Sequence, residues 1–383
     1  MPEENNSAAE AGAGAYSHAM LREIYEQPCA IRDTLARSFN GDIIFPLLPE
    51  HVAGWLGNVE KLIIVASGSS RHVGLVGELL IEQLAGLAID IEYASEYCNR
   101  SVDVDTRAVV LAITQSGESS DTIDALRAAR GRGQRALAIC NVPDSTAAHE
   151  ANAVLYTAAG PEIAIPATKS VMAQLVMLYL LGLFFARRRG RMSLPVMHSR
   201  ISQMAGLAPL VERNLAYWDK AALECAQTCQ RVRAFLFLGR DVHYPIAREG
   251  ALKLKECSYV NAEGLPVGEL RHGSSALIDD DLAIVCIATH DPESPDSMLR
   301  YEKTLRVLDH VKELGGRVVA VATEGDQEIT RYAEGVVYVP REDELLLPFL
   351  ELPPLQLFAY HFALLAGCDV DRPRNLVKAV ISQ

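Results

Sequence analysis

The sequence predicts an α/β protein in which two copies of one unit each form a five-stranded parallel sheet between layers of helices. Short runs of apolar and β-branched residues alternate with segments of helical periodicity, a pattern typical of βαβ units and parallel sheets. The alternation occurs twice along 383 residues, and long helical segments separate the two halves. A chain of this length that is 49% hydrophobic and 22% charged can bury the large core that a three-layer αβα sandwich requires.

The first half is predicted to open with helices before its sheet begins. An amphipathic helix is expected from Tyr16 to Leu35, interrupted at Pro28, and a short helix from Val52 to Leu56. From Lys61 onward strands and helices alternate. We predict strands at Leu62–Ala66, Ala88–Tyr93, Ala108–Thr114, Ala136–Cys140 and Ala153–Tyr156, and helices at Val73–Leu84 and Ile123–Arg130.

The second half repeats this order after a helical connection. Three helices are predicted in the connection, at Thr168–Arg187, Met197–Ala216 and Ala221–Cys229. The strands that follow are predicted at Ala234–Leu238, Leu282–Ala288, Val318–Ala322 and Gly335–Val339, and the helices at Pro245–Cys257, Pro295–Leu314 and Leu352–Leu365. The two halves therefore look like diverged copies of one five-strand unit.

A loop rich in hydroxyl groups, from Thr114 to Thr122, joins a buried strand to the start of a helix. The first backbone N–H groups of a helix lack internal partners, and the helix dipole favours negative charge there. The hydroxyls of Thr114, Ser116 and Ser119 add neutral donors, and Gly117 allows a ligand to approach the backbone closely. The loop suits a phosphate monoester, although an ordinary helix cap would use the same residue types.

A second loop of the same kind, Ser67-Gly68-Ser69-Ser70, follows the first strand of this half. Because loops at the carboxyl ends of neighbouring parallel strands meet at one crevice, two hydroxyl-rich loops favour a phosphate site. Neither loop carries a dinucleotide or P-loop motif. The corresponding loop of the second half, Thr289 to Ser294, contains Pro292 and two acids and would hold an anion poorly, so one phosphate site is expected.

Candidate acid–base residues are concentrated in the second half. Glu249, Lys253 and Glu256 are spaced to share one helix face, which fits either catalysis or a solvated ladder of ion pairs. Glu263, Glu269 and His272 follow, and a carboxylate and an imidazole near a sugar phosphate suit proton abstraction beside a carbonyl. Near the C-terminus Lys378 is isolated among apolar residues. A buried lysine with a lowered pKa can form a Schiff base with a ketose, whereas an exposed one would have no such role.

Composition limits the other classes of function. The net charge of −13 argues against nucleic-acid binding, and no metal or cofactor motif is present among the scattered eight cysteines. The longest apolar run, Val171 to Ala186, is too short for a membrane span and is predicted to be a buried helix. The first residues contain no basic or apolar start of a signal peptide, so we expect a cytoplasmic protein with reduced thiols, no cofactor and no membrane partner.

Several motifs occur in an order that resembles one family. They are Glu23-Ile-Tyr-Glu-Gln-Pro28, Ser67-Gly-Ser-Ser70, Gln115-Ser-Gly-Glu118, Ala167-Thr-Lys169, the helix Glu249 to Glu256, Gly268-Glu-Leu-Arg-His-Gly273 and the block Asp369 to Lys378. From about His18 to its end the chain resembles the isomerase part of glucosamine-6-phosphate synthase (glutamine–fructose-6-phosphate aminotransferase), which consists of two sugar-isomerase (SIS) domains. The resemblance implies a tail at 1–16, a helical segment at 17–60, SIS domains at 61–216 and 217–366, and a tail at 367–383 that closes the active site.

The resemblance also implies a role for each matching residue. The sugar phosphate would be held by Ser69, Ser70, Thr114, Gln115, Ser116 and Ser119. Glu256 would move a proton between C1 and C2 beside Lys253, and Lys378 would form an imine with fructose 6-phosphate. His272 would assist ring opening from the neighbouring subunit, so that a homodimer would be the minimum working unit.

Two departures from the family pattern bear on function. The chain opens Met1-Pro2-Glu3 without the family's glutaminase half, so a chain complete as written would need ammonia or a separate glutaminase partner. The stretch Gly160-Pro161-Glu162 looks more like stand-alone SIS deaminases. The leading expectation is a hexose-6-phosphate isomerase of the synthase type. The alternatives are a deaminase of glucosamine 6-phosphate and a non-catalytic sugar-phosphate sensor.

Overall fold

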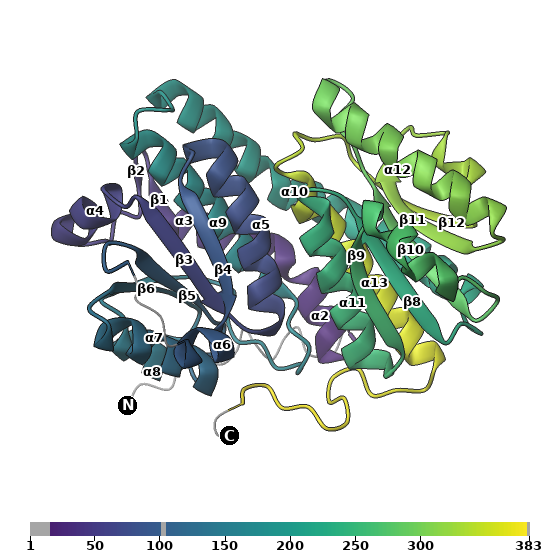
Figure 1. Ribbon diagram of the computed structural model, residues 1–383, viewed down its shortest axis with the longest axis horizontal. Helices are drawn as coiled ribbons and strands as arrows, with labels where there is room; N and C mark the ends of the chain where they lie inside the picture. The colour runs from purple at the N-terminus through teal and green to yellow at the C-terminus, as the bar shows by residue number, and fades with distance from the viewer. Residues whose placement is uncertain (1–15, 101–104, 381–383) are drawn as a thin grey trace.

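The computed structural model describes residues 16–100 and 105–380 and confirms the predicted fold class. Two five-stranded parallel sheets lie in the two halves of the chain, each covered by helices, as Figure 1 shows. A small antiparallel pair, β1 (Phe39–Asn40) with β2 (Ile43–Ile44), accompanies the first sheet. The N-terminal part of the predicted tail, residues 1–15, lies outside the described residues.

The first sheet has the strand order β4-β3-β5-β6-β7, in which all neighbours run parallel. Its central strand, β5, is buried along its whole length because helices cover both of its faces. From β3 the chain first adds β4 on one side and then crosses over to add β5 on the other side. The point between β3 and β5 is therefore the topological switch point of the sheet, where ligands of open α/β sheets bind. The strands are β3 (Lys61–Ala66), β4 (Ala88–Tyr93), β5 (Val109–Ile113), β6 (Arg135–Cys140) and β7 (Ala153–Tyr156).

The helices of the first half are α5 (Gly68–Ala85), α6 (Ala94–Asn99), α7 (Ser120–Gly131), α8 (Thr146–Glu150) and α9 (Lys169–Arg188). Helices α5 and α9 pack closely together. A Cβ atom at Gly77 would lie 2.6 Å from Leu178, so glycine permits this approach. The long apolar helix α9 is buried from Lys169 to Ala186, as predicted, and is a core helix. The short helices α6 and α8 were not predicted, because neither contains enough turns to show a helical period.

The second sheet repeats the first, with the order β12-β11-β10-β8-β9. The predicted strands are found as β8 (Ala234–Gly239), β10 (Leu282–Ala288), β11 (Arg317–Thr323) and β12 (Gly335–Val339). The fifth strand, β9 (Asn261–Pro266), was missed because its sequence contains Asn, Glu, Gly and Pro. The helices are α11 (His243–Ser258), α12 (Pro295–Glu313) and α13 (Leu347–Leu365), with short 3₁₀ segments η1 (Val267–His272), η2 (Ser274–Leu277) and η3 (Ile329–Arg331).

The connection between the halves differs from the prediction. The separate helices predicted at 197–216 and 221–229 are joined into one continuous helix, α10 (Leu194–Thr228), which contains Pro209 and is capped by Cys229. The predicted domain boundary at residue 216 falls within this helix, and the domain limits therefore stay a prediction. The N-terminal segment forms α2 (Ala19–Tyr25) and α3 (Gln27–Ser38), broken before Pro28 as predicted, and α4 (Glu50–Gly57).

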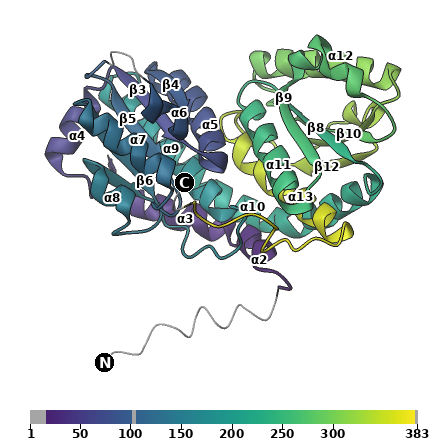
Figure 2. The same cartoon turned by 60° about the horizontal axis from the view of Figure 1, so that its bottom comes forward.

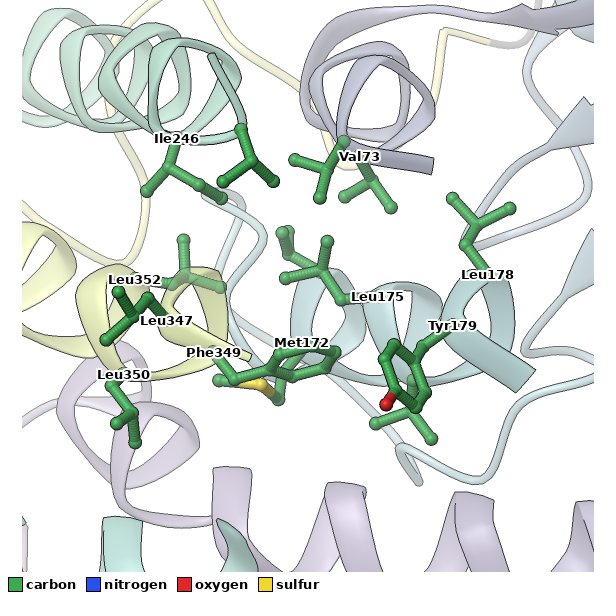
Figure 3. Packing of buried hydrophobic residues seen from close by; sticks show 14 of the residues in the cluster. Val73, Met172, Leu175, Leu178, Tyr179, Ile246, Leu347, Phe349, Leu350 and Leu352 are labelled. Carbon is green, nitrogen blue, oxygen red and sulfur yellow. The ribbon is translucent and has the colours of Figure 1, made fainter. Parts of the chain in front are cut away.

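One continuous hydrophobic core joins the two halves. In Figure 3, Val73 of α5, Ile246 of α11 and Leu175 of α9 approach one another, with residues of α13 below them. Helices α5 and α11 consequently pack side by side. The packing fixes the polar face of α11 relative to the loops that follow β3 and β5. The C-terminal tail then runs from the second half back to the first, as Figure 2 shows.

Candidate active site

A polar crevice of about 170 Å³ lies at the carboxyl ends of β3 and β5, where the sheet topology predicts a ligand site. The first half contributes both hydroxyl-rich loops, α11 contributes one edge, and the C-terminal tail closes another. The lining residues are Ser67, Ser69, Ser70, Ile113, Thr114, Gln115, Ser116, Ser119, Thr122, Ile165, Ala167, Lys253, Glu256, Leu376, Val377 and Lys378. All six predicted phosphate-binding residues and three of the four predicted catalytic residues therefore line one crevice.

The loop after β5 is held in shape by its own side chains. The Thr114 hydroxyl accepts a hydrogen bond from the backbone N–H of Gly117 at 3.1 Å, and the Ser116 hydroxyl accepts one from Glu118 at 3.1 Å. Gly117 has a φ of +72°, and a Cβ atom there would lie 2.0 Å from the Ser145 hydroxyl. Glycine is thus required at this turn.

The acid of this loop is held by the start of helix α8. The Glu118 carboxylate accepts hydrogen bonds from the Thr146 backbone N–H and hydroxyl, both at 2.8 Å, and does not line the crevice. These bonds, the backbone one first, hold the pKa of Glu118 below its usual value. Ser119 occupies the N-cap position of α7, but its side chain makes no capping hydrogen bond. Its hydroxyl is thus available to a ligand, which favours the phosphate interpretation over the ordinary cap.

The loop after β3 becomes helical earlier than predicted. Helix α5 begins at Gly68, so Ser69 and Ser70 lie in its first turn, where backbone N–H groups lack helical partners. Ser67 is the N-cap residue and makes no side-chain capping bond. Two helix N-termini, those of α5 and α7, therefore flank the crevice and favour a bound anion.

The acidic and basic groups of α11 form a buried chain of contacts, not a solvated ladder. The Lys253 ammonium lies 2.5 Å from the Glu256 carboxylate and 3.6 Å from Glu249, and the Lys253 side chain is 1% exposed. The His72 imidazole contacts the other side of Glu249 at 2.8 Å. Burial alone would raise the pKa of Glu249, but Lys253, His72 and Ser69 lower it. Burial alone would lower the pKa of Lys253, but Glu256 and then Glu249 raise it. Lys253 is thus held as an ammonium, and Glu256, 23% exposed, is the carboxylate that reaches the crevice.

The sequence suggested that Lys378 is isolated among apolar groups, but the structure places it in an ion pair. Its ammonium donates to the Glu162 carboxylate and to the Ala164 carbonyl, each at 2.7 Å. Glu162 is completely buried and also accepts hydrogen bonds from the Thr168 N–H at 2.9 Å and the Ser170 hydroxyl at 2.7 Å. Burial would raise the pKa of Glu162, but Lys378 and these donors lower it, so it is a carboxylate. The sequence contained Glu162 but gave no sign that it would meet Lys378, 216 residues away.

Helix α2 supports the loop that carries Glu162. This contact explains why α2 buries an acid, Glu23. The Glu23 carboxylate accepts hydrogen bonds from the Ile163 and Ala164 backbone N–H groups at 2.5 and 3.3 Å. Burial raises the pKa of Glu23 to about 7. The tail is attached to the same helix, because Asp371 accepts hydrogen bonds from the N–H groups of Ala19 and Met20 at 2.9 and 2.8 Å.

His272 is the predicted catalytic residue that one chain does not bring to the crevice. It ends η1 in the second half, is exposed and does not line the crevice. Glu263 and Glu269 are also exposed and lie outside the crevice lining. Within a single chain the site therefore consists of the two hydroxyl-rich loops, Lys253, Glu256 and Lys378.

The equivalent position in the second half is filled by an acid. Thr289, which matches Thr114 in the repeat, donates a hydrogen bond to the buried carboxylate of Glu351. The His243 imidazole contacts the same carboxylate at 2.6 Å, and the side chain of Glu344 lies on its other side. A carboxylate at this position would repel a phosphate, which agrees with the expectation of one phosphate site.

Comparisons with known proteins identify similar chains. The SIS domain family matches residues 56–183 and 230–366, one match for each half. A glutamine–fructose-6-phosphate aminotransferase (isomerizing) from Thermus thermophilus is 44% identical over 370 residues, which are 96% of this chain and 59% of that protein. One from Methanosarcina acetivorans is 44% identical over 368 residues, 95% of this chain and 58% of that protein. The chain thus spans somewhat more than half the length of these relatives.

A solved structure matches almost end to end. It is the C-terminal domain of glucosamine-fructose-6-phosphate aminotransferase from Francisella tularensis, 32% identical in sequence. The match covers 94% of this chain and 99% of that one, with a TM-score of 0.86. Both halves and their arrangement are therefore shared with this structure.

Proposed function

This chain belongs to the SIS domain family, and we propose that, like the isomerase region of the glutamine–fructose-6-phosphate aminotransferases to which it is similar, it interconverts ketose and aldose forms of a hexose 6-phosphate. With ammonia as the nitrogen donor, it would convert fructose 6-phosphate to glucosamine 6-phosphate. The observation that carries this proposal is the crevice, in which uncharged anion donors of one half face an acid and two amines from other parts of the chain.

Phosphate binding is assigned to the first half. The hydroxyls of Ser70, Thr114, Ser116 and Ser119, with Ser69 and Gln115, would surround the phosphate at the N-termini of α5 and α7. Neutral donors and helix dipoles suit a chain whose net charge is −13, because they attract an anion without an excess of basic side chains. They would hold one end of the sugar and direct its first carbons toward α11.

The chemistry is assigned to Glu256, Lys378 and Lys253. After losing a proton, the Lys378 amine would add to the C2 carbonyl of the open ketose, and water would leave as the imine forms. Glu162, in contact with Nζ, would position this amine. Ammonia would then replace Lys378 at C2. The Glu256 carboxylate would remove a proton from C1 and return it to C2, while the buried Lys253 ammonium stabilises the negative charge that develops.

The site would be completed by a second copy of the chain. His272 is exposed and does not line the crevice of its own chain, so its proposed role in ring opening would require it to reach the crevice of a neighbour. We therefore propose a homodimer as the working unit. A separate glutaminase that supplies ammonia is a further proposed partner.

The assay that tests the proposed function distinguishes synthesis of glucosamine 6-phosphate from its deamination. Purified chain is incubated with fructose 6-phosphate and ammonium, with fructose 6-phosphate and glutamine, and with glucosamine 6-phosphate. Formation of glucosamine 6-phosphate from ammonium supports the proposed synthesis, whereas deamination without synthesis would support a deaminase that uses the same groups. Binding without turnover in every arm would contradict an enzymatic function and leave a sugar-phosphate sensor.

A further inference from the structure

A second polar pocket, of about 500 Å³, lies between the two halves and shares no lining residue with the crevice. Arg71 and Tyr93 line it from the first half, and Tyr244, Arg248 and Lys255 line it from α11. We call this the basic pocket. It lies beside the crevice, because Ser69 and Ser70 line the crevice from the same helical turn of α5 that places Arg71 in the basic pocket.

The three cations of the basic pocket form no ion pair with the described residues. The Arg71 guanidinium stacks 3.8 Å from the centre of the Tyr93 ring, and its Nε and Nη1 atoms are buried without a described hydrogen-bond acceptor. Among the described residues, Arg248 donates its side-chain hydrogen bonds to neutral groups, the hydroxyls of Tyr244 at 3.4 Å and Tyr93 at 3.5 Å. Burial, and then the repulsion of Arg248, lower the pKa of Arg71. An anion between the two guanidiniums would relieve this repulsion.

The remaining charged groups that line the basic pocket leave its net charge positive. His72 also lines the pocket, but it contacts the buried carboxylate of Glu249 at 2.8 Å. The exposed Glu263 is the acid among the described lining residues, against two arginines and Lys255. Two planar guanidinium groups, one of them already oriented by an aromatic ring, are the side chains that bind phosphate oxygens best in pairs.

We propose that the basic pocket is a second anion site, which binds a small phosphate-bearing molecule separately from the sugar phosphate in the crevice. The two guanidiniums hold the phosphate groups, Lys255 contributes long-range attraction, and the Tyr93 and Tyr244 rings form the walls. Its volume, about three times that of the crevice, accommodates a diphosphate or a phosphorylated metabolite. This site is independent of the reaction proposed above.

The test is a calorimetric titration of the full chain with inorganic pyrophosphate. Glucitol 6-phosphate, an unreactive open-chain sugar phosphate, is first added at saturation so that the crevice is occupied. We expect one remaining pyrophosphate site per chain. The double variant Arg71→Ala/Arg248→Ala should weaken it about tenfold or more, because each arginine removes hydrogen bonds to a charged group. Arg71→Lys/Arg248→Lys should keep part of the affinity, and Arg213→Ala, an exposed arginine of α10 outside the pocket, should keep all of it.

Several outcomes would overturn the proposal. One is the absence of a pyrophosphate site in the saturated chain, and another is equal affinity in the alanine double variant. A third is a change from dimer to monomer in that variant, measured by sedimentation, which would make the pocket a contact between copies. Glucitol 6-phosphate affinity, measured separately on each variant, shows that the chain is folded and keeps this test distinct from the function proposed for the crevice.

Discussion

At the scale of single residues, the proposed site separates binding from chemistry. The proposed phosphate donors are uncharged side chains, whereas the proposed catalytic acid and the two amines each have a partner of opposite charge. Lys253 is held between two glutamates, and Lys378 is held by Glu162. Each amine is therefore fixed in position by an ion pair before substrate arrives, which is the preorganisation that proton and imine chemistry require.

Replacing Glu256 with Gln tests the proposed proton transfer. The amide keeps the shape of the side chain but cannot accept a proton from C1, so turnover should fall by roughly 10²- to 10⁴-fold. Glucitol 6-phosphate affinity, measured by calorimetry, should change little because the phosphate donors are intact. The control is Glu302→Gln on the exposed side of α12. Turnover of Glu256→Gln equal to that of the control would remove Glu256 from the mechanism.

Replacing Ser116 with Ala tests the phosphate site. Loss of one hydrogen bond to a charged group, worth about 1.5 kcal/mol, should raise KM for fructose 6-phosphate by roughly tenfold. Part of the effect comes from the loop, because the same hydroxyl accepts a hydrogen bond from the Glu118 N–H. Ser116→Thr, which keeps the hydroxyl, should recover most of the affinity. Ser95→Ala on α6 is a control outside the crevice, and an equal KM in the Ser116→Ala and Ser95→Ala variants would refute the assignment.

At the scale of elements, the equivalent ends of the two sheets differ in the charge of the groups placed there. In the first half, the ends of β3 and β5 line the polar crevice that we propose holds the phosphate. In the second half, a cationic histidine at the start of α11 is enclosed by the carboxylates of Glu351 and Glu344. Burial alone would lower the pKa of His243, but these carboxylates raise it to about 9. The second crevice is thus replaced by an internal ion cluster that fixes the start of α11.

The raised pKa of His243 predicts how stability depends on pH. A histidine whose folded pKa is about 9 and whose unfolded value is about 6.5 stabilises the fold fully below pH 6.5. This contribution, up to about 3 kcal/mol, is lost as pH rises toward 9. Urea denaturation at pH 6.0, 7.5 and 8.5 should show stability falling less steeply for His243→Gln than for the unaltered chain. His149→Gln, at an exposed position, should fall as steeply as the unaltered chain, and equal slopes for all three would contradict the prediction.

At the scale of the whole molecule, the sequence predicted what periodicity and local chemistry encode. Nine of the ten sheet strands and both hydroxyl-rich loops were predicted, because apolar runs and serine clusters are local signals. The ion pair of Lys378 with Glu162 was not predicted, because the two residues are 216 positions apart and meet only when the C-terminal tail packs against the first half. The continuity of α10 was not predicted either, because the sequence was divided into two helices at residues 217–220, which the structure places inside α10. The approach of α11 to α5 depends on side-chain packing that no single segment reveals.

Local patterns in the sequence left the roles of the acid–base residues undecided, and the family resemblance favoured catalysis. From the residues alone, Glu249, Lys253 and Glu256 fitted a solvated ladder as well as a catalytic face. The burial of Glu249 and Lys253, with Glu256 at the crevice, excludes the solvated ladder. The role of His272 still depends on a second copy, so it stays a prediction.

The most direct test of the account is a crystal structure of the chain with fructose 6-phosphate bound. We predict that the phosphate lies within hydrogen-bond distance of Ser70, Ser116 and Ser119. The first two carbons of the sugar should lie beside Glu256 and Lys378. A sugar phosphate bound elsewhere, or bound in the crevice with its first carbons directed away from those two side chains, would contradict the account.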